Sequence, residues 1–246
     1  MGRVLIATAG WGVPREHAAL VKREGTGLQK YSSVLGAVEI NSTFYRRHQP
    51  KTFERWRDSV PAAFRFAVKL PRAITHEAAL AAPARALAEF FEDVSGLGAK
   101  LGPILVQLPA SAGFERRRAS SFFRALRARH SGPVACEPRN AAWYGATASA
   151  LFVDYDIARV VADPARPLAA QHAGGTDTLR YTRWHGSPHV YWSAYSDEQL
   201  RALLEATLNA PARSEVWCVF DNTASGAALA DAERFRVLLA RRIKQA

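Results

Sequence analysis

The sequence predicts an α/β protein, a single-domain (β/α)8 barrel of the TIM type that spans residues 1–246. Apolar runs rich in β-branched residues recur eight times, and amphipathic helical patterns separate most of them, as in a chain of βαβ units. The 246 residues also match the length that eight such units need. A doubly wound open sheet is the alternative, but the Gly-x-Gly-x-x-Gly pattern is absent after the first predicted strand.

The predicted strands are short apolar runs, most of which end in a polar residue. They span residues 4–9, 37–41, 64–69, 104–108, 134–137, 158–163, 179–185 and 216–221. Between them, apolar residues recur at helical spacing, most clearly over residues 83–97, 117–129, 148–155, 197–208 and 227–243. Ser196, followed by Asp197 and Glu198, predicts the start of the helix 197–208, because acidic residues in a first turn favour the helix dipole.

Two stretches between strands depart from the regular helical pattern. Residues 12–36 include Gly25 and Gly27, so we expect only a short helix there. Residues 164–178 include Pro167 and two glycines, which predicts a loop in place of the helix between the sixth and seventh strands. We find no linker, repeat or low-complexity segment, so we expect a single domain.

Composition is typical of a globular protein and indicates no membrane partner. Apolar residues make up 48% of the chain, and no apolar run approaches the ~20 residues that span a bilayer. The first residues lead directly into a predicted strand and leave no room for a signal peptide, so we expect a cytoplasmic protein. The two cysteines, Cys136 and Cys218, lie in apolar segments and are expected to be buried, inert thiols.

The charge balance is strongly basic, with a net charge of +11 and an isoelectric point near 10.2. Such a balance favours attraction to nucleic acid or to phosphorylated metabolites. Arginine clusters lie on two predicted helices, within residues 116–129 and 234–242. A solvated basic face is the alternative interpretation, and abundant arginine and alanine also follow from the base composition of a genome.

The strongest functional signal is a pair of polar residues set two apart at the end of a predicted strand. Strand side chains alternate between faces, so the two members of each pair point the same way. Burying a charge destabilises the fold unless the charge has a partner or serves a function. In barrels of this type, the carboxyl ends of the strands form the functional site. We therefore expect these pairs to converge on one polar site. The pairs are Glu39 with Asn41, Glu137 with Arg139, and Arg183 with His185.

Four residues at these strand ends are predicted catalytic groups, and two more are predicted metal ligands. Carboxylates in opposed environments can serve as general acid and base, and histidine and carboxylate side chains also bind divalent cations. A charged ladder is the alternative, in which Glu39 pairs with Arg183, or Glu137 with Arg139, only to satisfy burial. The predicted catalytic residues are Glu39, Glu137, His185 and Asp221, and His76 and Asp163 would complete a divalent-metal site with them.

The predicted substrate-binding residues are cations, amides and aromatic side chains near the same strand ends. Cationic side chains that point into one mouth favour an anionic group on the ligand, held by Lys69, Arg139 and Arg183. The turn at Asn222 leads into the last predicted helix, whose free N–H groups can bind phosphate. Exposed aromatic side chains would stack on a sugar or a nucleobase. The remaining members of this set are Trp11, Asn41, Tyr45, Gln107 and Trp143.

These residues lie within motifs that resemble the YecE-like family, also called domain of unknown function 72, nearly end to end. The motifs include Glu-Ile-Asn-Ser-Thr-Phe-Tyr at 39–45, Phe-Ala-Val-Lys at 66–69, Glu-Pro-Arg at 137–139 and Arg-Trp-His-Gly at 183–186. The resemblance implies a TIM-barrel-type fold and brings no activity with it. The chain departs from the family pattern at Ala9, where a serine is usual, and at Asn140, where a histidine is usual. The change at Asn140 removes one ligand and counts against a metal at the fifth strand.

Three functions fit these observations. The first is an enzyme of the hydrolase or lyase type that acts on a phosphate-bearing substrate, including nucleic acid, with or without a divalent metal. The second is a metal-free sugar-processing enzyme in which two carboxylates flank the reacting carbon. The third is a nucleic-acid-binding module without catalysis, whose binding would weaken steeply as salt rises. Carboxylates tied up in salt bridges would favour anion binding, and three or four ligands around one point would favour metal chemistry.

Overall fold

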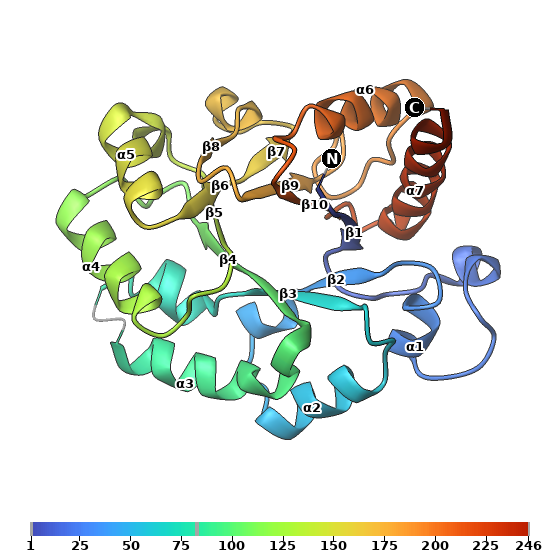
Figure 1. Cartoon of the computed structure of the whole chain (residues 1–246), viewed down its shortest axis with the longest axis horizontal. Helices are drawn as coiled ribbons and strands as arrows, with labels where there is room; N and C mark the ends of the chain where they lie inside the picture. Colours follow the sequence, from blue (N-terminus) through green and yellow to red (C-terminus); the bar gives the residue numbers. More distant parts are fainter. Residues whose placement is uncertain (1, 82–83, 246) are drawn as a thin grey trace.

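The computed structural model describes residues 2–81 and 84–245, and its strands form two sheets (Figure 1). The strands are β1 (Val4–Thr8), β2 (Ala37–Ile40), β3 (Arg65–Lys69), β4 (Leu101–Leu108), β5 (Val134–Pro138), β6 (Ile157–Arg159), β7 (Val161–Asp163), β8 (Gly174–Gly175), β9 (Leu179–Trp184) and β10 (Glu215–Phe220). Their order is β1-β10-β9-β7 in the four-stranded sheet and β2-β3-β4-β5-β6-β8 in the six-stranded sheet. Neighbouring strands run parallel, except that β8 is antiparallel to β6.

The two sheets are joined at two junctions. Ala9, directly after β1, forms a parallel bridge with Glu39 of β2, and the N–H of Gly10 donates to the Glu39 carbonyl at 2.8 Å. At the other junction, β6 and β7 are consecutive and separated only by Val160, whose N–H donates to the Cys136 carbonyl at 2.9 Å. Because β6 pairs with β5 and β7 pairs with β9, the parallel strands of both sheets point their carboxyl ends the same way.

The described α-helices lie around the periphery of the strands (Figure 1). They are α1 (Gly27–Tyr31), α2 (Pro50–Asp58), α3 (Ala84–Val94), α4 (Arg116–Arg127), α5 (Ala146–Asp154), α6 (Asp197–Leu208) and α7 (Ala227–Gln245). Short 3-10 segments span Arg15–Leu20, Ser42–Phe44, Ser95–Lys100, Ala141–Tyr144 and Leu168–Gln171, and a π-helical turn spans Ala73–Glu77. Among the helices that the structure describes, none has the length and apolar character needed to cross a membrane.

Most predicted elements are present, with small shifts at their ends. Each predicted strand is found, although the sixth, at 158–163, is divided into β6 and β7 at Val160. The predicted helix 83–97 corresponds to α3, and its first predicted residue, Pro83, lies outside the described residues. Residues 164–178 hold a 3-10 segment and the short strand β8 where a loop is predicted in place of a helix.

One face of the strands changes from apolar to polar along its length, and this change positions the site. The apolar part forms a core cluster of its own, separate from the main core between strands and helices. Alanines dominate it, and the rings of Tyr181 and Trp217 stack at 6.1 Å. Gly102 leaves space for this stack, since a Cβ there would lie 2.7 Å from the Trp217 ring. Two residues further along the strands, the same face carries Lys69 after Ala67, Glu137 after Ala135, and Arg183 after Tyr181.

Candidate active site

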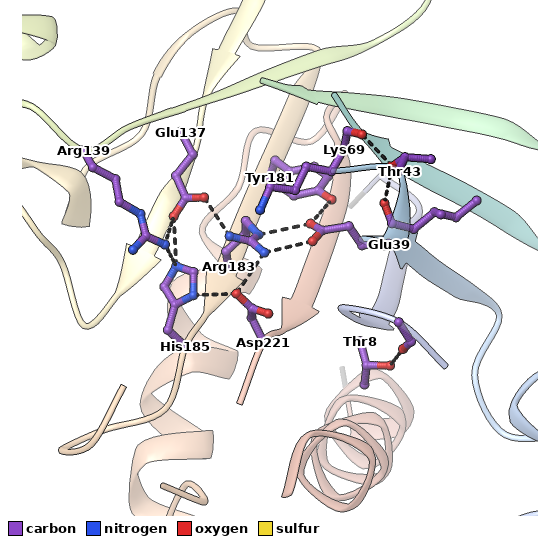
Figure 2. Close-up of polar contacts among 12 residues, drawn as sticks. Thr8, Glu39, Thr43, Lys69, Glu137, Arg139, Tyr181, Arg183, His185 and Asp221 are labelled. Atoms are coloured by element: carbon purple, nitrogen blue, oxygen red, sulfur yellow. Dashed lines mark hydrogen bonds and ion pairs between the residues drawn. The ribbon is translucent and has the colours of Figure 1, made fainter. Parts of the chain in front are cut away.

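A buried guanidinium lies at the centre of the polar groups at the strand ends (Figure 2). Arg183 donates from Nε and Nη2 to the two carboxylate oxygens of Glu39, at 3.1 and 2.9 Å. Its Nη1 donates to Glu137 at 2.7 Å, and its Nη2 also donates to Asp221 at 2.9 Å. The Tyr181 hydroxyl donates to the same Glu39 carboxylate at 2.8 Å. Residues of β2, β5, β9 and the segment after β10 thus meet around one cation.

His185 extends this network between two of the carboxylates. Its Nδ1 lies 3.0 Å from an oxygen of Asp221, and its Nε2 lies 2.9 Å from an oxygen of Glu137. Each ring nitrogen must carry a proton to donate to a carboxylate, so the geometry selects the imidazolium form. Burial opposes that charge, but Glu137 and Asp221 overcome it and raise the pKa of His185. The arginine cluster, as we call this group, comprises Glu39, Glu137, Tyr181, Arg183, His185 and Asp221.

Electrostatics fix the charge states within the arginine cluster. Burial opposes ionisation of Glu137, but Arg183 and His185 hold its pKa well below the usual range. Burial also opposes ionisation of Asp221, whose pKa Arg183 and His185 nevertheless lower. Arg183 is fully buried, yet its three carboxylate partners raise its pKa well above the usual value. Such a network is stable only because each charge has its partners, since a buried charge left alone is strongly destabilising.

Two further cations lie beside the arginine cluster. Arg139 donates to Glu137 at 3.2 Å, and its side chain is 27% exposed. Lys69 is only 6% exposed, and its Nζ lies 4.0 Å from the centroid of the Phe44 ring. Burial, together with the charge of Arg183, lowers the pKa of Lys69 to about 8. Within residues 2–81 and 84–245, no carboxylate forms a salt bridge with Lys69, so no direct partner compensates its charge.

The site as a whole carries a surplus of positive charge. With every group ionised, four cations face three carboxylates, which leaves one positive charge. Arg183, predicted to hold an anionic ligand, is fully buried and donates four hydrogen bonds to carboxylates. Lys69 and Arg139 are therefore the cations that remain for a ligand. The four cations are Lys69, Arg139, Arg183 and His185, and the carboxylates are Glu39, Glu137 and Asp221.

Two of the predicted ligand-binding residues have structural partners instead. Trp143 is buried in the core, where its Nε1 donates to the Ala112 carbonyl at 2.9 Å, so it has no exposed face for stacking. Asn222 is fully buried and donates to the Ser193 carbonyl at 3.0 Å and to Asp231 at 2.8 Å. These bonds connect the end of β10 to α7 and to the segment before α6, which leaves the Asn222 amide hydrogens no role in binding a ligand.

The other predicted ligand-binding residues lie around the site at different depths. Gln107 of β4 is buried and pairs in register with Glu137 of β5, so the two side chains are neighbours. Tyr45 follows β2 and is 76% exposed, while Trp11 packs edge-on against a tryptophan of α2 at 4.9 Å. The Oδ1 atom of Asn41 is buried and has no hydrogen-bond partner among the described residues. Of this group, Gln107 is the one whose position beside the arginine cluster is fixed by strand pairing.

The predicted divalent-metal site is not assembled. Asp163 accepts a hydrogen bond from the Tyr195 hydroxyl at 2.8 Å, and Nδ1 of His76 lies 2.9 Å from the Thr75 hydroxyl. In the part of the chain that the structure describes, no group of three or more His, Cys, Asp or Glu side chains is placed to hold a metal ion. The physical reason is that the Arg183 guanidinium already occupies the space between the carboxylates, where a cation would bind.

Some residues of the site are not marked by the paired strand ends. Tyr181 binds Glu39 and precedes Arg183 by two residues, so carrying the same spacing one step back along the strand would find it. The Thr43 hydroxyl lies 3.1 Å from the Ile40 carbonyl and 2.7 Å from the Lys69 carbonyl, and thus ties the ends of β2 and β3 together. No spacing rule marks this contact, because its two partners lie on neighbouring strands.

Fold and site together define an α/β protein with parallel strands whose carboxyl ends carry a buried, charge-paired polar cluster. The chain belongs to the family described as "Protein of unknown function DUF72", whose model matches residues 5–246. The UPF0759 protein YecE of Escherichia coli K12 is 35% identical over 103 residues, which cover 42% of this chain and 38% of that protein. The match therefore spans well under half the length of that relative, and the family assignment confirms the resemblance seen in the motifs.

Solved structures of DUF72 family proteins share the fold. One from Enterococcus faecalis V583 superposes with a TM-score of 0.81 at 22% identity, covering 96% of this chain and 95% of that chain. Another from Thermotoga maritima MSB8 gives a TM-score of 0.79 at 25% identity, covering 97% of this chain and 99% of that chain. The similarity extends over the whole fold and carries no activity with it.

Proposed function

We propose that this protein is an enzyme of the lyase or hydrolase type that acts on a small anionic substrate, such as a phosphate ester, at the mouth of a (β/α)8 barrel. The order of the parallel strands and the two junctions between the sheets support the barrel. The observation that carries the function is the surplus positive charge of the site, where Lys69 has no ion-pair partner among the described residues and the partly exposed Arg139 lies beside the cluster. Cations in such a position attract an anion and bind it by charge-assisted hydrogen bonds.

The burial of Lys69 favours a small molecule over a nucleic acid. Nucleic-acid binding depends on exposed lysine and arginine side chains that reach the phosphate backbone. Lys69 is almost completely buried, its Nζ lies against the Phe44 ring, and the charges of the arginine cluster act on it. Only a ligand small enough to enter the site can therefore reach its ammonium group.

The pairing of the carboxylates argues against the sugar-processing alternative. A glycosidase needs one carboxyl group kept protonated by a raised pKa and a second that is free to attack carbon or to activate water. Glu137 has a lowered pKa, and both oxygens of Glu39 accept hydrogen bonds from Arg183. Glu39 and Glu137 therefore hold Arg183 in place, and neither is free for the roles that a glycosidase requires.

Calorimetric titration with inorganic phosphate tests the anion-binding basis of this proposal. Arg139→Gln removes a charge-assisted donor worth ~1.5–3 kcal/mol, so phosphate should bind about 10- to 100-fold more weakly. The melting temperature should stay close to that of the wild type, because Glu137 keeps Arg183 as a partner. The matched control is Arg85→Gln, since Arg85 is an exposed arginine paired with Glu89 on α3.

The control separates binding at the site from general attraction to a basic protein. Arg85→Gln removes the same charge and should leave the phosphate affinity unchanged. Equal affinities in the wild type and Arg139→Gln would contradict the proposal, and so would an equal loss in both variants. A further consequence concerns turnover: on any phosphate ester that the wild type consumes, Arg139→Gln should lower kcat/KM by a similar factor.

A further inference from the structure

We propose that Lys69 is a Schiff-base nucleophile, and that the substrate is a small aldehyde or ketone whose carboxylate or phosphate group binds to Arg139. This inference deepens the proposed function and rests on it for the anionic group. In the step, the Lys69 nitrogen adds to the carbonyl carbon, the carbon–oxygen bond breaks, and the oxygen leaves as water with two hydrogens from the ammonium group. Protonated amine and carbonyl compound thus give protonated imine and water, with atoms and charge conserved.

The fold holds the Lys69 side chain where a nucleophile is needed. Lys69 is the last residue of β3, and its carbonyl is bound by the Thr43 hydroxyl at 2.7 Å. The side chain continues the face of Ala67, so it lies at the carboxyl ends of the parallel strands, where barrel enzymes carry their chemistry. Its Nζ lies over the Phe44 ring at 4.0 Å, so an aromatic face covers one side of the amine. The ring attracts the ammonium form, and burial acts against that form.

Within the arginine cluster, Arg183 binds the carboxylates, so they do not form ion pairs with the Lys69 amine. Arg183 takes up Glu39, Glu137 and Asp221 by direct hydrogen bonds, whereas none of the described carboxylates pairs with Lys69. A lysine locked in a salt bridge is charged and cannot attack a carbonyl carbon. Because the Arg183 guanidinium pairs with all three carboxylates, Lys69 has no ion-pair partner among the described residues and is the reactive group of the site.

The surroundings of Lys69 also favour the neutral amine. Burial and the Arg183 charge lower its pKa to about 8, against the opposing effect of three carboxylates. At pH 7 roughly a tenth of such a lysine is free amine, compared with less than about one part in a thousand for an ordinary lysine. The charged groups that act on it are Arg183 of β9, Glu39 of β2, Glu137 of β5 and Asp221 after β10. Burial and then the charge of Lys69 lower the pKa of the nearby His76.

Reductive trapping tests the proposal directly. The full chain is incubated at pH 7 with glyoxylate or with glycolaldehyde phosphate in the presence of cyanoborohydride, and labelled lysines are identified by peptide mass mapping. The chain has only six lysines, so each can be followed separately. We expect Lys69 to be labelled on the order of tenfold or more faster than Lys51 of α2, because more of it is neutral. Its labelling rate should rise with pH to a midpoint near 8, the value that its burial sets.

Variants and probes distinguish the outcomes. Lys69→Arg keeps the charge and should abolish the fast label, while the control Lys51→Arg should leave it unchanged. Arg139→Gln should slow labelling by the two anionic probes and leave labelling by uncharged glycolaldehyde unaffected. The probe whose labelling of Lys69 is slowed more by Arg139→Gln identifies the anionic group as carboxylate or phosphate.

Equal labelling of Lys69 and Lys51 by all three probes would overturn the Schiff-base proposal. Phosphate binding measured by calorimetry is independent of imine formation. If the proposed anion site is correct, phosphate binding should still be observed even when Lys69 and Lys51 are labelled equally. Fast labelling of Lys69 without any effect of Arg139→Gln would instead overturn the assignment of Arg139 as the group that binds the substrate anion.

Discussion

Glu39 stabilises the fold through Arg183. We therefore expect Glu39→Gln to lower the free energy of unfolding, and not only to abolish activity. The substitution leaves a fully buried guanidinium facing a neutral amide, and Arg183 loses the partner that binds it through two oxygens. Breaking a buried ion pair by removing one partner costs about 3–5 kcal/mol. Denaturant unfolding followed by circular dichroism should show a free energy of unfolding lowered by that amount.

The matched control for this prediction is Glu89→Gln, which makes the same chemical change at an exposed ion pair on α3. Because solvent screens exposed pairs, its unfolding midpoint should stay close to that of the wild type. If Glu39→Gln were as stable as this control, Arg183 would not depend on Glu39. The carboxylate of Glu39 would then return to the set of groups that are free to take part in catalysis.

Arg183 also shows how far residue spacing locates a site and where it stops. The two-residue spacing correctly places Arg183 and His185 on one face, and both join the arginine cluster. The carboxylate partners of Arg183 lie 144, 46 and 38 positions away along the chain. Only the register of neighbouring strands brings them together, so the sequence leaves open whether a strand-end glutamate binds a metal, a substrate or an arginine. The structure selects the arginine, which is the charged-ladder alternative for Glu39.

At the scale of elements, apolar periodicity predicts the long helices well and the short, charged helices poorly. The helix α6 begins at Asp197 and ends at Leu208, as predicted. The helix α2 is not predicted, because it is rich in charged residues and buries only Phe53. A different signal marks its start, since Pro50 occupies the first turn, where its missing N–H is not needed. Capping and proline signals therefore add information that periodicity does not contain.

The capping box at the start of α6 gives a prediction at the same scale. The Ser196 hydroxyl accepts from the N–H of Gln199 at 3.2 Å, and the Gln199 side chain accepts from the N–H of Ser196 at 2.8 Å. We expect Ser196→Ala to lower the free energy of unfolding by about 1 kcal/mol. Ser196→Asn keeps a capping acceptor and should remain near the wild type in the same chemical denaturation experiment. Equal losses in both variants would mean that the hydroxyl does not act as a cap.

At the scale of the whole molecule, the net charge is +11, and the arginine clusters differ in how many of their side chains form ion pairs. Arg234 and Arg236 of α7 form ion pairs with acidic side chains. The run 116–118 at the start of α4 consists of three exposed arginines that form no ion pair within the described residues. The sequence alone leaves both a solvated face and a nucleic-acid surface open for these clusters, because composition counts charges without showing which of them are already paired.

We therefore expect the run 116–118 to carry part of a non-specific affinity for nucleic acid that is independent of the Lys69 site. The logarithm of a DNA-binding constant falls with the logarithm of salt concentration, with a slope of ~0.9 for each phosphate neutralised. Replacing the three arginines by serine should lower the magnitude of that slope by up to about 3, measured by fluorescence anisotropy with duplex DNA. Arg236→Ser is the control, since its charge is already paired with Glu233, and it should leave the slope nearly unchanged. An unchanged slope in the triple variant would show that these arginines are only a solvated face, in which case the basic charge contributes solubility and the anion site acts alone.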